Sequence, residues 1–202
     1  MGYQDLDDIR RTYQGYQDEK IIKMAKEEAR GLRNEVVLIL LHEIESRQLS
    51  SKLKDYVFAS RRILSKLEKE TLRRKVKESR CSLCRENREL AGYRVVSITG
   101  ILIETISIEQ DLILCESCGL ERYRKASRQT MMFGWWSILG IIQTSGEVIH
   151  KTRRLLTGEE LEREDIIDNF LNEYLVPITL GNDDAQIIEN LLEKYNQREL
   201  SK

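Results

Sequence analysis

The feature that most constrains this chain is the arrangement of its four cysteines, which occur as two pairs. Cys81 and Cys84 form the first pair and Cys115 and Cys118 the second, with two residues between the cysteines of each pair. This spacing lets one tight turn direct two sulfur atoms at one ion, and two such turns complete a tetrahedral thiolate site for Zn²⁺. The sequence therefore predicts that Cys81, Cys84, Cys115 and Cys118 bind one zinc ion.

Two other uses of paired cysteines agree less well with the rest of the chain. Disulfides need an oxidising compartment, and the polar, acidic start of the chain does not resemble a signal peptide. A redox-active C-x-x-C pair normally accompanies a βαβ pattern, which the sequence lacks. We therefore expect a cytoplasmic protein with a structural zinc site. Four thiolates leave no coordination position for water or substrate, so such a site stabilises a fold.

The residues around the cysteines predict a three-stranded zinc ribbon over residues 81–120. Residues 93–98 alternate in polarity, residues 101–108 are rich in β-branched side chains, and residues 111–114 lead into Cys115. Thr99 and Gly100 are placed to form the hairpin turn. Gly119 follows the second cysteine pair and suits a turn with positive φ, whereas Arg85 follows the first pair.

Helices are predicted on both sides of the ribbon, so the expected fold class is mainly α. Residues 1–16 are interpreted as a flexible arm or a short helix. Residues 17–80 are interpreted as a hairpin of two helices, over about 18–49 and 51–79, because apolar residues recur there at helical spacing. Residues 121–202 form a C-terminal helical region that packs on the hairpin and the ribbon. In this region Pro177 is expected to end one helix and residues 182–184 to start the last.

A short apolar segment carries both tryptophans, Trp135 and Trp136. It is too short to cross a bilayer, which needs about 20 apolar residues. It can be buried core, an exposed patch that binds a partner, or an anchor in the membrane interface, and burial in the core is the first of these interpretations. A membrane partner is therefore not expected.

The segment also carries a resemblance to a known group of proteins. The C-x-x-C-G motif at 115–119, a basic helix and then Gly134-Trp135-Trp136-Ser137 with Gly140 resemble uncharacterised bacterial zinc-ribbon proteins. The resemblance covers about residues 81–149 and leaves out the flanking helices. It implies a bound zinc and a bacterial cytoplasmic setting, and it implies no activity.

Charge is unevenly distributed although the net charge is only −1. Residues 61–80 hold nine basic and three acidic side chains, and residues 159–202 hold twelve acidic and four basic ones. Charge runs are mostly solvated faces, so the first interpretation is that the two regions pack near each other or face water. The alternative is that they are two surfaces for two different partners.

The basic region, helped by Arg122, Arg124, Lys125 and Arg128, offers a nucleic-acid-binding surface as one alternative function. Five of its cations recur at helical spacing and share one face, as phosphate binding requires. An overall pI near 6.2 and the lack of stacking aromatic residues argue against this alternative. The five cations are Arg62, Lys66, Lys69, Arg73 and Lys77.

Catalysis is not expected, because every cysteine is assigned to the metal and the two histidines, His42 and His150, are far apart in the sequence. We expect His42 to be at least half-buried. The expected function is therefore the non-catalytic binding of a protein partner. The protein would act as an adaptor, or as an inhibitor of the immunity or antitoxin type whose acidic surface docks on a basic partner. The residues considered for that contact are Asp165, Asp168, Glu173, Trp135 and Trp136.

Overall fold

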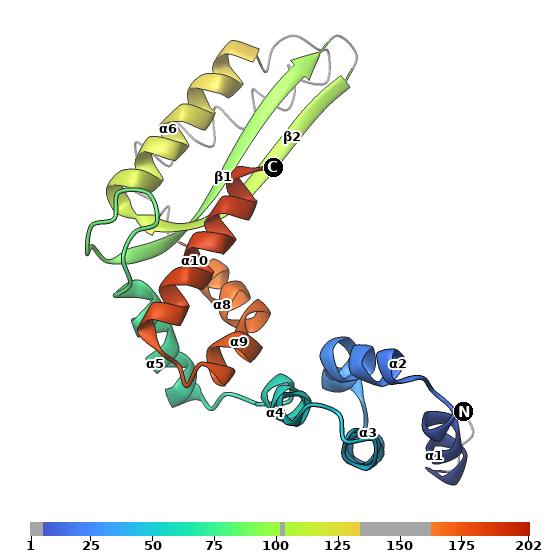
Figure 1. Cartoon of the computed structure of the whole chain (residues 1–202). Helices are drawn as coiled ribbons and strands as arrows, with labels where there is room; N and C mark the ends of the chain where they lie inside the picture. The colour runs from blue at the N-terminus through green and yellow to red at the C-terminus, as the bar shows by residue number, and fades with distance from the viewer. Residues whose placement is uncertain (1–5, 102–103, 134–162) are drawn as a thin grey trace. The chain divides into compact units, whose positions relative to one another are not determined.

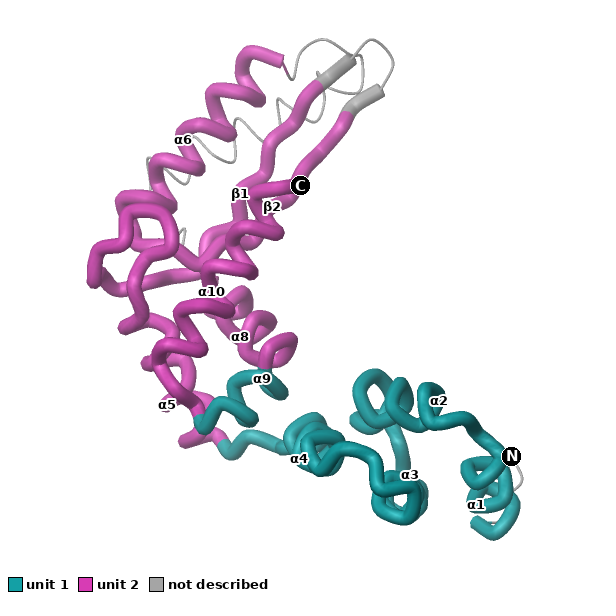
Figure 2. Tube along the Cα trace, viewed as in Figure 1, with its two compact units in different colours: residues 1–65, 175–182 teal, residues 66–174, 183–202 magenta. Residues whose placement is uncertain are grey.

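A computed structural model describes residues 6–101, 104–133 and 163–202 of the chain (Figure 1). The described residues are mainly helical, with one sheet of two antiparallel strands. The chain divides into two compact units (Figure 2), and unit 1 comprises residues 1–65 and 175–182. Unit 2 comprises residues 66–174 and 183–202. The predicted mainly-α fold class is confirmed.

Unit 1 is a set of short helices around a core of aliphatic side chains. Ile21, Leu40, Ile44 and Val57 are each 0% exposed, and all four belong to the apolar patterns that predict helices in this region. The helical elements of unit 1 are α1 (Leu6–Gln14), α2 (Asp18–Lys23), a π-helical turn η1 (Met24–Glu28), a 3₁₀ turn η2 (Ala29–Gly31), α3 (Asn34–Ser46), α4 (Ser51–Ser60) and α9 (Leu175–Leu180).

The first long helix expected over residues 18–49 is broken in the structure. Leu32 and Arg33 are extended, with ψ of 146° and 152°, so the chain turns between η2 and α3. Arg61 explains the stability of this break, because its guanidinium donates hydrogen bonds to the carbonyl oxygens of Ala29 and Leu32 at 2.8 and 2.6 Å. A distant side chain thus replaces the intrahelical hydrogen bonds that the break removes.

Residues 6–14 of the expected arm form helix α1, so the short helix, the second of the two interpretations, describes them. Within α1, Tyr13 is only 5% exposed and belongs to the core of unit 1. Arg47, which follows α3, donates hydrogen bonds to the carbonyl oxygens of Tyr13, Gln14 and Tyr16. The arm is therefore ordered by a cation at the C-terminal end of its helix, where cations are favourable.

The second expected helix, over residues 51–79, is two helices that belong to different units. It consists of α4 and α5 (Lys66–Lys77), and residues 62–65 between them are not helical. Pro177 was expected to end a helix, but it lies inside α9, and the preceding helix α8 (Glu164–Glu173) ends earlier. The start of the last helix, α10 (Ala185–Leu200), is confirmed, since the Asp184 carboxylate accepts a hydrogen bond from the backbone N–H of Gln186 at 2.7 Å.

Unit 2 is built on a long hairpin of two strands, β1 (Leu90–Ile101) and β2 (Glu104–Cys115), paired from Leu90 with Cys115 to Ile101 with Glu104. The prediction of three strands is wrong for these residues. Thr99 and Gly100 lie within β1 rather than in a turn, and the polar residues near Asp111 do not interrupt β2. Asp111 faces Arg94 across the ladder, and two hydrogen bonds of 2.7 and 2.8 Å join their side chains.

Helices cover both edges of this hairpin (Figure 1). Helix α6 (Glu116–Phe133) packs on β1, where the Thr130 hydroxyl accepts a hydrogen bond from the N–H of Ile98 at 3.1 Å. Helix α10 packs on β2, where the Asn196 amide accepts from the N–H of Ile113 and donates to its carbonyl oxygen, at 2.9 and 2.8 Å. The Asn196 side chain thereby acts as the peptide group of a third strand and closes the sheet edge.

Candidate metal centre

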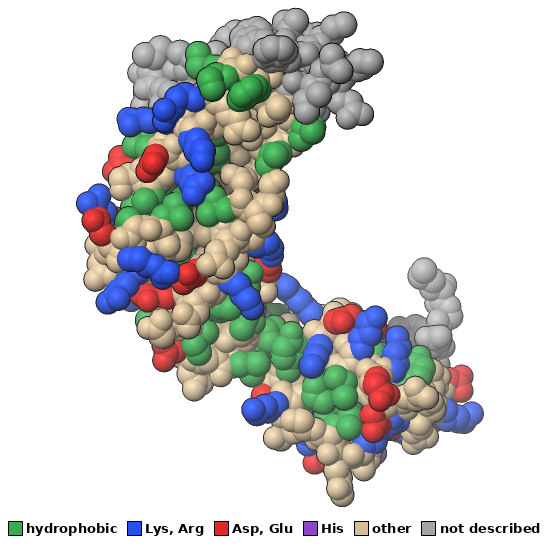
Figure 3. All heavy atoms as spheres, turned by 45° about the horizontal axis from the view of Figure 1, so that its top comes forward, with side chains coloured by type: hydrophobic (Ala, Val, Ile, Leu, Met, Phe, Trp, Pro, Cys, Tyr) green, Lys and Arg blue, Asp and Glu red, His purple; other side chains and the backbone are tan. Residues whose placement is uncertain are grey.

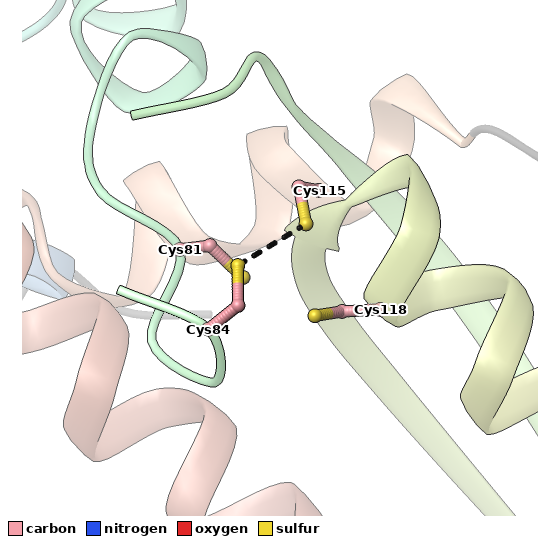
Figure 4. Close-up of side chains that lie close together, drawn as sticks. All are labelled: Cys81, Cys84, Cys115 and Cys118. Atoms are coloured by element: carbon pink, nitrogen blue, oxygen red, sulfur yellow. Dashed lines mark hydrogen bonds between the residues drawn. The ribbon is translucent and has the colours of Figure 1, made fainter. Parts of the chain in front are cut away.

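The four cysteines meet at one end of the hairpin, as the sequence predicts (Figure 4). Cys81 and Cys84 lie in the turn before β1, Cys115 is the last residue of β2, and Cys118 is in the first turn of α6. Their sulfur atoms all lie within 4.8 Å of one another and point toward a common centre, and the Sγ atoms of Cys84 and Cys115 are 3.7 Å apart. This geometry can bind a metal ion.

The cluster is protected on most sides. Cys81 and Cys115 are 0% exposed and Cys118 is 9% exposed, whereas Cys84 is exposed. The distance of 3.7 Å between the sulfurs of Cys84 and Cys115 is far longer than a disulfide bond of about 2.05 Å, and all four cysteines are free thiols. Among the described residues, these four cysteines are the one group of cysteine, histidine or acidic side chains whose ligand atoms lie close enough together to hold a metal ion.

The first cysteine pair lies in a tight turn that Arg85 completes. The N–H of Arg85 donates to the carbonyl oxygen of Cys81 at 2.8 Å, and the N–H of Cys81 donates to the carbonyl oxygen of Glu86 at 3.1 Å. Arg85 has a φ of 62°, a left-handed conformation that glycine adopts more readily. The position that needs positive φ is therefore occupied by an arginine.

The role expected of Gly119 is corrected by the structure. Gly119 lies within α6, and the second cysteine pair spans a strand end and a helix start instead of forming a second turn. A Cβ atom at Gly119 would lie 2.6–2.7 Å from ring atoms of Tyr93, which is itself buried in β1. Glycine is needed here because the helix approaches the strand closely, not because the backbone is left-handed.

Replacing Gly119 with alanine is expected to destabilise unit 2 by about 1–3 kcal/mol, because overpacking against the Tyr93 ring outweighs the better helix propensity of alanine. Gly31→Ala is a control of the same chemistry, since no atom lies within 4 Å of a Cβ built there, and it should leave stability unchanged or slightly raised. Hydrogen exchange of amides in β1 and β2 measures the effect within unit 2. Unchanged protection in Gly119→Ala would contradict the close approach.

The thiols of the cluster do not ionise independently. Burial opposes ionisation of Cys115, but hydrogen bonds from the Ser117 hydroxyl and the backbone N–H of Cys118, together with the neighbouring thiols, lower the pKa of Cys115 to about 6. Burial and then the hydrogen bond with Cys115 raise the pKa of Cys118 above its ordinary value. One thiolate thus forms easily and opposes the next, and a cation at the centre would remove that repulsion.

Helix α10 holds the turn that carries Cys81 and Cys84. Glu193 accepts two hydrogen bonds from the Arg85 guanidinium, at 3.1 and 2.6 Å, and the Asn196 amide donates to the Ser82 hydroxyl at 2.9 Å. Because Glu193 and Asn196 are three residues apart, they lie on the same face of the helix. Asn196 therefore joins the turn to β2, since it also bonds Ile113.

Asn196 and Glu193 support the turn that carries Cys81 and Cys84, and the sequence interpretation missed both of them. Asn196 is 1% exposed and follows the apolar stripe of α10, where it stands four residues after Leu192. A polar side chain at an apolar position of a helix was the available signal, because a buried amide needs hydrogen-bond partners. The sequence could not show that these partners are Ile113 and Ser82, more than 80 residues away.

The basic face predicted over residues 61–80 is largely neutralised within the protein. Asp168 of α8 accepts hydrogen bonds from Arg73 at 2.6 and 2.5 Å and from Lys69 at 2.9 Å, and Glu164 pairs with Lys77 at 3.5 Å. Of the other two predicted residues, Lys66 is exposed, and Arg62 donates to the Thr179 hydroxyl within unit 1 at 3.2 Å. The basic and acidic regions therefore pack against each other.

The acidic residues considered for partner binding take part in ion pairs. Hydrogen bonds from Arg73, followed by those from Lys69, hold the pKa of Asp168 below its usual value. Arg163 lowers the pKa of Asp165, and Arg198 lowers that of Glu173, through hydrogen bonds to each carboxylate.

The remaining predicted residues are placed as follows. Trp135 and Trp136 lie outside the described residues, as does His150. His42 is exposed, contrary to the expectation that it would be at least half-buried.

None of the described helices is long and apolar enough to cross a membrane. Comparison of the chain with protein families, with curated protein sequences and with solved structures gave no match.

Proposed function

We propose that this protein is a non-catalytic scaffold, organised by one Zn²⁺ ion, that binds another protein. The observation that carries the proposal is the closed set of four cysteine sulfurs. Sulfur atoms bound to one zinc at about 2.3 Å in a tetrahedron lie roughly 3.8 Å apart, close to the 3.7 Å between Cys84 and Cys115. Four thiolates also suit zinc better than hard cations such as Mg²⁺ or Ca²⁺.

The position of the ligands supports a structural role for the ion. It would join a turn, the end of a strand and the start of a helix, which together hold one end of the hairpin. A zinc with four protein thiolates has no open coordination position for a substrate or a water molecule. We therefore assign a structural role to the metal centre, and we expect partner binding to occur at a separate surface of the protein.

The surface that we choose for the protein partner is a groove in unit 1 between α4 and α9. Its volume is about 590 Å³, and Phe58 and Leu180 line it with side chains that are 61% and 45% exposed. Exposed apolar side chains in a concave site with a polar rim are typical of protein interfaces. Asp55 and Asn182 provide polar groups at this rim.

A protein that binds another protein in this way could be an adaptor, or it could be an inhibitor of the immunity or antitoxin type. An inhibitor would dock on a basic partner, and the acidic residues considered for that contact were Asp165, Asp168 and Glu173. Because each of them already pairs with an arginine, a basic partner would have to exchange with these pairs. The groove carries no such cost and is the better target for a test.

The test compares Phe58→Glu with Leu38→Glu, a matched control whose side chain is 67% exposed on α3 and does not line the groove. Zinc-loaded protein is used to capture partners from the source cells after nuclease treatment, and the affinity for the captured protein is then measured with purified components. We expect one stoichiometric partner whose affinity falls at least tenfold in Phe58→Glu and is unchanged in Leu38→Glu. Capture of no protein after nuclease treatment, or equal affinity of both variants, contradicts the proposal.

Nucleic-acid binding through residues 61–80 is the alternative function, and the ion pairs of α5 support it less well. Lys69, Arg73 and Lys77 would have to leave Asp168 and Glu164 before they could bind phosphate. Nucleic-acid binding that is lost when Lys66, Lys69 and Lys77 are replaced with glutamine would favour this alternative.

A further inference from the structure

The outward face of helix α6 carries cations that differ from those of α5. Arg124, Lys125 and Arg128 are exposed, and their spacing of three and four residues places them on one face. The opposite face of α6 is buried through Tyr123 and Ala126. The orientation of the three cations is therefore fixed by the packing of the helix on the hairpin.

These cations have no acidic partner in the described part of the chain. Arg124, Lys125 and Arg128 form neither an ion pair nor a side-chain hydrogen bond there, although Glu121 lies one turn away on the same face. By contrast, Lys69 and Arg73 of α5 share Asp168. A cation that the protein leaves unpaired is available to an external anion without the loss of an internal contact.

The charge of this face is also locally unbalanced. Residues 121–128 contain four basic side chains, those of Arg122, Arg124, Lys125 and Arg128, and one acidic side chain, that of Glu121. Residues 26–35 of unit 1 hold another exposed set of cations, Lys26, Arg30 and Arg33, but they also hold three glutamates, so their net charge is zero. Figure 3 shows Lys and Arg side chains in blue on the visible surface of unit 2, some of them beside Asp and Glu side chains in red.

We propose that the outward face of α6 binds the phosphate backbone of nucleic acid, without reading its sequence. Arg124 and Arg128 are four residues apart, or about 6 Å along the helix. Charges on one strand of a duplex recur about every 3.4 Å along its axis, so the three cations can contact two or three phosphates. DNA and RNA both present this chemistry.

A nucleic acid fits this face better than a lipid surface does. Helices that bind in the membrane interface insert an apolar face beside their cations. Beside the three cations the apolar face of α6 is already used, since Tyr123 and Ala126 are buried in unit 2 and the Thr130 hydroxyl bonds the N–H of Ile98. The exposed apolar side chains of α6, Met131, Met132 and Phe133, are confined to its last turn, which is much shorter than the apolar face of an interfacial helix. Between residues 121 and 129 the exposed side chains are all polar or charged.

The test uses the zinc-loaded full chain and fluorescent duplexes of about 20 base pairs, one of DNA and one of RNA, titrated between 50 and 200 mM salt. Release of three counterions predicts a slope of about −2.7 in log K against log salt, which is about a 40-fold loss of affinity over this range. The triple variant R124Q/K125Q/R128Q should lose most of this slope and more than tenfold in affinity at 50 mM salt. The control K26Q/R30Q/R33Q, which removes the same charge from unit 1, should bind as the parent does.

The outcomes separate the sources of the phosphate. Tighter binding of one duplex identifies DNA or RNA as the ligand and supports the proposal. No binding at 50 mM salt, or unchanged binding by the α6 variant with its metal retained, overturns it. Lipid headgroups are tested as the alternative source of phosphate with vesicles of phosphatidylcholine that contain about 30% phosphatidylserine, to represent an acidic membrane surface. Tighter binding to these vesicles than to either duplex also overturns the proposal.

Discussion

Replacing Cys81 with serine is expected to abolish metal binding and to destabilise unit 2 by about 5 kcal/mol or more. Cys81 is 0% exposed, and its sulfur is one of four that lie within 4.8 Å of one another. Binding a structural zinc contributes roughly 10–16 kcal/mol in small zinc domains, and a serine hydroxyl is a poor replacement for a thiolate. The measurement is metal content together with hydrogen exchange of amides in β1 and β2.

A matched control for this change lies in the same turn. Leu83 stands between Cys81 and Cys84, is 38% exposed, and offers no metal ligand. Leu83→Ser should therefore retain the metal and the protection of the hairpin amides. If Cys81→Ser kept both as well, the cysteine cluster would not be the element that holds this end of unit 2.

Replacing Asn196 with leucine is expected to destabilise unit 2 by about 2–5 kcal/mol, although the two side chains have similar volumes. The change removes hydrogen bonds to the N–H and carbonyl oxygen of Ile113 and to the Ser82 hydroxyl. Ile113 is 0% exposed, so its backbone groups would stay buried without partners, at about 1–3 kcal/mol for each group. Because Ser82 lies between two ligands, metal affinity should fall about 10- to 100-fold.

The control for this prediction is Gln197→Leu at the next position of α10. Gln197 is exposed, and its side chain bonds only Glu193 in the described structure, so stability should change by less than about 0.5 kcal/mol. Urea unfolding and competition with a chromogenic chelator measure the two effects. Equal stability of the Asn196 and Gln197 variants would show that the edge of β2 does not depend on the amide.

The clustering of the four cysteines and the helical fold class could be predicted from the sequence because both depend on local patterns. Two residues between cysteines limit the distance between their sulfurs, whatever the rest of the chain does. The same spacing did not show that Cys118 belongs to a helix, since both a tight turn and the first turn of a helix direct two such sulfurs at one point. The hairpin was divided wrongly because the polar residues near Asp111 resemble a loop. In the structure Arg94 across the ladder donates to Asp111, and the Gln110 side-chain amide donates to the carbonyl oxygen of Glu199 in α10.

Contacts between distant segments could not be predicted. The break in the first helix depends on Arg61, which donates to Ala29 and Leu32 about 30 residues earlier. The pairing of the basic and acidic regions was one of two interpretations, and only the contacts of Asp168 with Lys69 and Arg73 distinguish them. Local composition gives the charge of each segment, whereas the fold decides which charges remain available to a partner.

The most direct test of the central claim is the metal content of the freshly purified protein, prepared without chelators and measured by elemental mass spectrometry. The proposed Zn²⁺ site predicts one zinc per chain, together with four cysteines that react with thiol reagents only after the metal has been removed. Well under one zinc per chain, with all four thiols reactive from the start, would contradict the proposed centre. A stoichiometric amount of another metal would contradict its assignment to zinc.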